Sequence, residues 1–155
     1  MKSARFTLGS NGNDRLASSF GDNLTFGLGG DDTLSGVNSN SDSPGIQYLH
    51  GGNGSDRFEL FIGDDFGGSG IDTEFATDNK YSESFIKVLD YSQDDSLIID
   101  LSGLPQSALD GLQIERYSIG DSRYSDIYIN DLAGTGNLVA TVTGSEYVVH
   151  SDVFG

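Results

Sequence analysis

Three aspartates recur at the same place within a glycine-rich unit of nine residues. Asp14, Asp32 and Asp56 each occupy position 6 of a unit that has glycine at positions 1 and 4 and a large apolar residue at position 8. The three units span residues 9–17, 27–35 and 51–59. A fourth unit, 67–75, keeps the glycines and Asp72 but has glutamate at position 8. Carboxylates repeated at a fixed period are hard oxygen donors, which suit a hard cation.

The period predicts how these carboxylates are arranged. Six residues make a turn and three make a strand, so two units complete one coil of a parallel solenoid and Asp14 stacks on Asp32. Asp56 continues the column after a six-residue insertion at 36–41, and Asp72 extends it. Neighbouring coils lie ~4.8 Å apart, where two carboxylates repel by roughly 3–4 kcal/mol at an effective dielectric constant of 20. A divalent cation between them turns this repulsion into coordination.

The apolar positions fit the same register. The middle residue of each short strand should point inward, because side chains alternate along a strand. The position-8 residues are Leu16, Leu34, Leu49 and Phe58. The unit 18–26 breaks the pattern, with Leu24 and Phe26 on either side of Thr25, so we expect a register shift or bulge there.

The opposite side of the solenoid has no matching carboxylates. Its degenerate units place Asn23 and Gln47 at position 6. Neutral side chains there predict weak or absent metal sites.

Composition excludes several functions. The chain has 155 residues, and 24 acidic residues against 8 basic ones give a net charge of −16, which would repel nucleic acids and anionic membranes. Cysteine is absent, which removes disulfides and thiolate zinc sites. Disorder is the competing interpretation of so high a charge. Only 2 prolines, with 9 phenylalanines and 7 tyrosines spread along the chain, argue for a fold.

The second half reads as ordinary β-structure. Strands are expected at 84–91, 96–102, 113–119, 123–132, 137–143 and 146–150, with one short helix within 104–111. We therefore predict an all-β chain that forms a single module over 1–155. A parallel β-roll at 5–75 continues into an antiparallel, sandwich-like β-cap at 76–155.

At the repeats the chain resembles a known family. The unit 51–59 reads Gly-Gly-Asn-Gly-Ser-Asp-Arg-Phe-Glu, which is similar to the RTX nonapeptide of haemolysin-type calcium-binding proteins. The resemblance implies a parallel β-roll that binds Ca²⁺ between successive turns, through position-6 carboxylates and turn carbonyls. The implied metal-binding residues are Asn11, Gly12, Asp14, Gly29, Gly30, Asp32, Asn53, Gly54, Asp56 and Asp72. Asp65 is left open between a ligand and an aspartate that caps its own turn.

A second resemblance covers residues 86–104. This segment is similar to the one that follows RTX repeats in serralysin-type proteases and in the R-modules of secreted mannuronan C5-epimerases, with Tyr91 in place of their phenylalanine. It implies a β-cap and export by the type I secretion apparatus, using an uncleaved C-terminal signal that 151–155 resembles. The first twelve residues lack an apolar stretch of signal-peptide length. We expect a secreted or cell-surface protein without a cleaved N-terminal signal peptide and without membrane insertion.

The sequence thus predicts a non-catalytic module that folds on binding Ca²⁺ outside the cell. No Gly-x-Ser-x-Gly, His-Glu-x-x-His or phosphate-binding loop is present. Three alternatives are left open: a flexible Gly/Asp linker, a polysaccharide-binding accessory module of a carbohydrate-active enzyme, and an enzyme with its site in the cap. The net charge makes direct binding of an anionic polysaccharide depend on bridging calcium.

Overall fold

The fold is built almost entirely from β-strands. The computed structural model describes residues 4–18, 21–38, 45–62, 85–102, 104, 106–130, 136–149 and 152–154. Its strands are β1 (Arg5–Leu8), β2 (Arg15–Ala17), β3 (Asn23–Gly29), β4 (Thr33–Asn38), β5 (Ile46–Asn53), β6 (Arg57–Ile62), β7 (Phe85–Tyr91), β8 (Ser96–Asp100), β9 (Gln113–Ile119), β10 (Ser122–Asn130), β11 (Gly136–Gly144) and β12 (Val153–Phe154). The short helix α1 (Gln106–Leu109) lies within the expected segment. No helix in these described ranges is long and apolar enough to span a bilayer.

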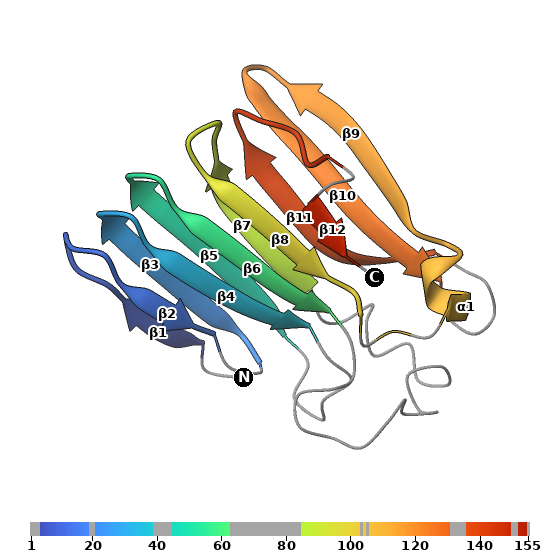
Figure 1. Cartoon of the computed structure of the whole chain (residues 1–155), viewed down its shortest axis with the longest axis horizontal. Coiled ribbons are helices and arrows are strands. Elements are labelled where there is room, and N and C mark those ends of the chain that lie inside the picture. The colour runs from blue at the N-terminus through green and yellow to red at the C-terminus, as the bar shows by residue number, and fades with distance from the viewer. Residues whose placement is uncertain are drawn as a thin grey trace.

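The strands form two sheets that the chain visits alternately. One sheet has the order β1-β3-β5-β7-β11-β10-β9 and the other β12-β8-β6-β4-β2. From β1 to β8, each odd strand and the even strand after it form one coil, and neighbouring coils pair in parallel. Figure 1 shows the four coils side by side, from blue β1 and β2 to yellow β7 and β8. The predicted all-β parallel roll is confirmed.

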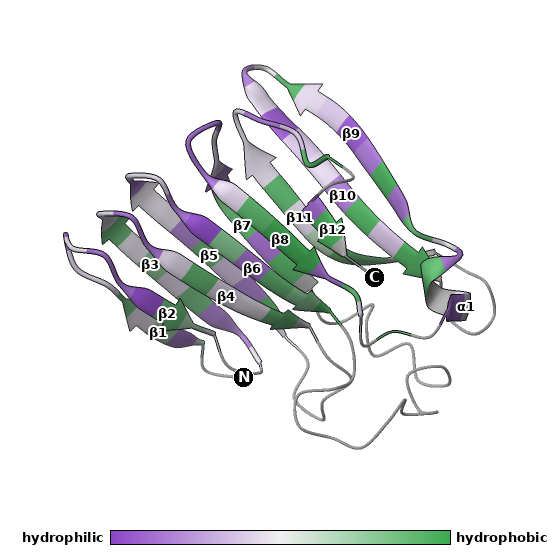
Figure 2. Cartoon of the chain, viewed as in Figure 1, coloured by the Kyte–Doolittle hydropathy of each residue, from purple (hydrophilic) through white to green (hydrophobic). Residues whose placement is uncertain are grey.

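The core lies between the sheets and is built from the inward residues of each coil. Leu34 pairs with Leu16 on one side and with Phe58 on the other, and Phe58 pairs with Leu97. Leu34 and Phe58 are fully buried, and only the first member of this row, Leu16, is half-buried. The alternating hydrophobic and hydrophilic bands in Figure 2 follow this arrangement along the strands. Stacking of the coils is therefore what removes these side chains from water.

The bulge expected in the unit 18–26 does not occur in its described part. β3 keeps a continuous parallel register with β5, with Thr25 opposite Leu49. Thr25 points inward and its hydroxyl lies 3.0 Å from Ser18 Oγ, so each hydroxyl satisfies the other. Leu24 and Phe26 face outward instead. Thr25 therefore occupies an inward position where the repeat pattern has an apolar residue, and its hydrogen bond with Ser18 makes this burial possible.

The parallel coils continue beyond the glycine-rich segment. β7 and β8 form the fourth coil, after which β11 pairs in parallel with β7, and β12 with β8. β10 pairs antiparallel with both β11 and β9, which lengthens one sheet into the cap. The prediction of a strand at 146–150 is wrong for the residues that the structure describes, because 146–149 form no strand. There the chain crosses between the sheets, and its last strand is β12.

Candidate metal centre

Four aspartates form a column along one side of the roll, in the turns that join odd strands to even ones. The amide of Asp14 donates to Oδ1 of Asp32 at 2.8 Å, and the amide of Asp32 donates to Oδ1 of Asp56 at 3.0 Å. The amide of Asp56 then donates to Oδ1 of Asp95 at 2.8 Å. The carboxylates of Asp32, Asp56 and Asp95 are thereby each held by the coil before them, and spacings of 18, 24 and 39 residues all place aspartates in register.

Asp95 was not singled out by the sequence pattern. Its unit, 90–98, has no glycine, although it retains aspartate at position 6 and Leu97 at position 8. These two positions were the signal that could have found it. The predicted ligands Asp65 and Asp72 lie outside the described residues.

One carboxylate oxygen in this column is buried without a partner. Asp32 is only 1% exposed, and its Oδ2 accepts no hydrogen bond from the described residues. A Cβ placed on Gly27 would lie 2.1 Å from this oxygen and 2.5 Å from the carbonyl oxygen of Gly51 in the next coil. A side-chain oxygen and a main-chain oxygen therefore converge where only glycine leaves room. This donor set fits a hard cation.

The next carboxylate lies in a similar place. A Cβ placed on Gly51 would lie 2.1 Å from Oδ2 of Asp56. In the first coil, by contrast, Oδ2 of Asp14 accepts hydrogen bonds from the amide of Ser10 at 2.6 Å and from its hydroxyl at 2.9 Å. Among the described residues, the buried carboxylate oxygen without a hydrogen-bond partner is therefore Oδ2 of Asp32, and Oδ2 of Asp56 lies in the equivalent place one coil further on.

Negative charge accumulates around Asp56. Burial raises the pKa of Asp56, and the hydrogen bond from the Asp32 amide lowers it. The pKa is raised further by three neighbouring carboxylates, Asp95, Asp32 and Asp90.

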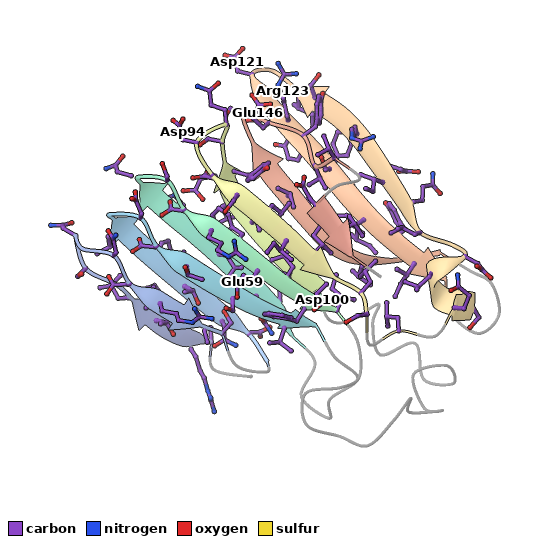
Figure 3. All side chains as sticks on the ribbon, viewed as in Figure 1. Glu59, Asp94, Asp100, Asp121, Arg123 and Glu146 are labelled. Carbon is purple, nitrogen blue, oxygen red and sulfur yellow. The ribbon has the colours of Figure 1, made fainter. Side chains whose placement is uncertain are left out.

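Nearby arginines do not neutralise the column, because they pair elsewhere. Arg57 Nε donates to Glu59 at 2.8 Å, and Arg15 lies 3.8 Å from the same carboxylate. Figure 3 labels Glu59 on the sheet, away from the turns that carry the column.

The turn residues around the column take up unusual backbone conformations. Gly30 and Gly54 have φ angles of 99° and 135°, and Gly52 has 102°. Leu28 has the same position in its unit as Gly52 and a φ of 82°, which is strained for a residue with a side chain.

The other predicted turn residues stack between coils. A Cβ placed on Gly29 would lie 3.6 Å from Oδ1 of Asn11 in the coil before it and 3.8 Å from the carbonyl oxygen of Asn53 in the coil after it. The amide of Gly12 donates to Ser10 Oγ at 3.1 Å. These residues bring further oxygens to the turn edge without showing a free carboxylate.

A second ladder of hydrogen bonds runs beside the column. The amide of Asp31 donates to Oδ1 of Asn13 at 2.8 Å, and the amide of Ser55 donates to Oδ1 of Asp31 at 2.9 Å. Asp31 therefore stabilises the stacking of turns.

Asp90 links the third coil to the fourth. It accepts hydrogen bonds from the amides of Gly51 and Gly52 at 2.9 and 2.7 Å, and lies 3.2 Å from His50 Nδ1. Its carboxylate thus has three partners in the protein.

The opposite side of the roll uses hydrogen bonds within the protein. Buried Asn23 donates to the carbonyl of Gly21 at 3.0 Å. Buried Gln47 both donates to and accepts from the main chain of Val37. These amides satisfy main-chain groups, which leaves them little capacity for a metal.

No cluster of three or more His, Cys, Asp or Glu side chains suited to a metal ion is found in the described ranges. A cation bound at the column would therefore take several of its ligands from main-chain carbonyls. Ca²⁺ tolerates such an irregular set of oxygen ligands more readily than Mg²⁺ does.

Comparisons with known proteins agree with the fold. The structure is similar to the solution structure of the AlgE6R3 subunit from the Azotobacter vinelandii mannuronan C5-epimerase, with a TM-score of 0.51. The two sequences are 19% identical, and the match covers 97% of this chain and 77% of that one. The sequence matches no family model and no curated protein. At this identity the likeness shows the shared all-β roll.

Proposed function

We propose that this chain is a calcium-binding module whose β-roll folds when Ca²⁺ binds. The observation that carries the proposal is the buried Oδ2 of Asp32, which has no partner among the described residues. Burying a carboxylate oxygen that accepts no hydrogen bond is unfavourable. A cation at this point would offset both that burial and the repulsion along the column.

The residues that would hold the ion belong to consecutive coils. Asp32 and Asp56 offer carboxylate oxygens, Gly51 offers its carbonyl, and Asp14 opens the column one coil earlier. Calcium would supply two positive charges and accept an irregular set of oxygen ligands. Since these oxygens meet only when the coils stack, metal binding and burial of the core favour each other.

The same coupling supports an extracellular role. Without calcium, a net charge of −16 and the mutual repulsion of the stacked column carboxylates favour an expanded chain. Such a chain suits export through a narrow channel, and calcium near 10⁻³ M outside the cell would then drive folding. We include type I secretion, a secreted or cell-surface location and the absence of intrinsic catalysis in the proposal. The support is the charge, the sequence resemblance and a fold shared with a subunit of an epimerase.

Calorimetric titration with Ca²⁺ tests the proposal. We expect saturable binding at about 10⁻⁴–10⁻³ M, the strength of extracellular calcium modules. Mg²⁺ at the same concentrations should give weaker binding, because it demands near-ideal octahedral geometry. A chain that binds neither ion in this range would overturn the proposal.

A second candidate function is binding of a polysaccharide, and an aromatic cluster in the cap favours it. The rings of Tyr117 and Tyr124 stack at 5.0 Å across β9 and β10, and Tyr117 is 41% exposed. The acidic residues Asp126 and Glu115 lie on the same two strands. These two carboxylates would repel an anionic polysaccharide unless a calcium ion bridged the polysaccharide and the protein. A glycan array probed with and without calcium tests this function, which requires glycan binding that is lost in Tyr117→Ala.

A further inference from the structure

The last aspartate of the column differs from Asp32 because both of its carboxylate oxygens accept hydrogen bonds. Asp95 Oδ1 accepts from the amide of Asp56 at 2.8 Å. Its Oδ2 accepts from the amide of Ser92 at 2.8 Å and from the Ser92 hydroxyl at 3.0 Å. The corresponding Oδ2 of Asp32 has no partner in the described part of the chain.

The backbone around Asp95 also differs. Its amide donates to the carbonyl of Ser92 at 3.1 Å, which closes a four-residue turn at 92–95. No residue of this turn has a positive φ, whereas the inner turns contain Gly30 and Gly54 at 99° and 135°. The fourth turn therefore lacks the glycine conformations that expose main-chain oxygens in the inner turns.

Asp95 nevertheless remains in the column by register. Ser96 pairs with Arg57, and Leu97 with Phe58, so the fourth coil continues the same stack. The amide and hydroxyl of Ser92 thus donate to Oδ2 of Asp95, whereas Oδ2 of Asp32 accepts from no described residue.

We propose that the Ser92–Asp95 turn takes the place of a calcium ion at the last step of the column, so that metal binding ends at Asp56. This inference rests on the proposed calcium-binding function. Hydrogen bonds from the protein satisfy the Asp95 carboxylate permanently, and this step of the column needs no cation.

The number of bound ions in single variants tests the inference. Asp56→Asn, Asp95→Asn and Asp94→Asn each remove one negative charge, and Asp94 is the matched control because it is exposed at the tip of the same turn (Figure 3). Native mass spectrometry and calorimetry at saturating Ca²⁺ give the count. We expect Asp56→Asn to lose at least one ion, while Asp95→Asn and Asp94→Asn retain the wild-type number.

An Asp95→Asn protein that loses as many ions as Asp56→Asn would overturn the inference and leave the proposed function intact. A wild-type protein that binds no calcium would overturn the proposed function itself. If Asp95→Asn fails to fold, carboxyl ¹³C NMR of the wild type decides the matter, with Ca²⁺ exchanged for Sr²⁺. The carboxyl resonances of Asp32 and Asp56 should move while that of Asp95 stays in place, and an equal movement at Asp95 would contradict the inference.

Discussion

The main-chain amide of Asp32 donates a hydrogen bond of 3.0 Å to Oδ1 of Asp56, one coil further along the roll. The same residue that fixes its neighbour's carboxylate leaves its own Oδ2 buried and unpartnered among the described residues. The contact stabilises stacking of the coils, and stacking in turn creates an electrostatic cost. A cation bound at the column would offset this cost, which is why we expect folding and calcium binding to be coupled.

Asp32→Asn should remove at least one bound calcium ion. The variant keeps Oδ1 as an acceptor for the Asp14 amide but replaces the free Oδ2 with an amide that cannot bind a cation. Ion counting by native mass spectrometry measures the loss. Asp31→Asn, which keeps its acceptor for Ser55, and Asn23→Ala on the opposite side should both retain the wild-type number. Equal losses in all three variants would show that the site is elsewhere.

Phe58→Ala should weaken calcium binding although Phe58 offers no ligand. The side chain is fully buried between Leu34 and Leu97, so its truncation should cost about 3–5 kcal/mol. The coils then stack less favourably, and more calcium is needed to reach half-folding in a titration followed by circular dichroism.

Leu89→Ala is the matched control for Phe58→Ala, because Leu89 is an exposed apolar residue and its truncation should leave the calcium midpoint unchanged. A Phe58→Ala protein with wild-type calcium affinity would indicate sites that are formed before folding, contrary to the coupling argued above.

Much of the roll follows from the sequence because each coil repeats one pattern. Position 8 predicted the buried row of Leu34 and Phe58, and position 6 predicted the stacking of Asp14 on Asp32. Local rules were enough here, since register in a parallel roll is set by the period and by which side chains must be buried.

Elements that satisfy polar groups inside the fold were harder to predict. Thr25 faces inward because Ser18 provides a partner, which no apolar periodicity signals. Asp95 joins the column from a turn without glycine, because a serine amide and hydroxyl satisfy its carboxylate. The final strand β12 depends on pairing with β8 across a long separation in sequence, which local propensity cannot reveal.

Acid should affect the calcium-free and calcium-bound proteins in opposite directions. Burial and neighbouring carboxylates raise the pKa of Asp56 above its ordinary value of 3.8. Because the pKa of Asp56 is higher in the folded state than in the unfolded state, protonation favours folding. This stabilisation is complete below the unfolded-state pKa and is lost as the pH rises through the folded-state pKa. In buffer freed of calcium beforehand, lowering the pH from about 7 to about 4 should therefore increase the folded fraction.

With calcium present, protons compete with the ion for Asp56, so the calcium midpoint should rise as pH falls over the same interval. Asp56→Asn should reduce both pH dependences, as measured by circular dichroism at several pH values. A calcium-free protein that loses structure on mild acidification would contradict this sign.

Leu28→Gly should stabilise the roll. Leu28 has a φ of 82° and is 42% exposed, so the substitution relieves backbone strain at a residue outside the buried core. We expect a gain of about 1 kcal/mol in the calcium-bound protein, measured by chemical denaturation. Leu28→Ala keeps the Cβ and should show no comparable gain. A Leu28→Gly protein less stable than Leu28→Ala would mean that strain at this residue is not the governing effect.

Far-ultraviolet circular dichroism with calcium added and then removed by EGTA tests the central claim most directly. The column of Asp14, Asp32 and Asp56 predicts that β-structure is lost in EGTA and returns when Ca²⁺ is restored, with no such recovery in Mg²⁺ alone. Identical β-spectra in EGTA and in millimolar Ca²⁺ would contradict the claim that calcium drives this chain to fold.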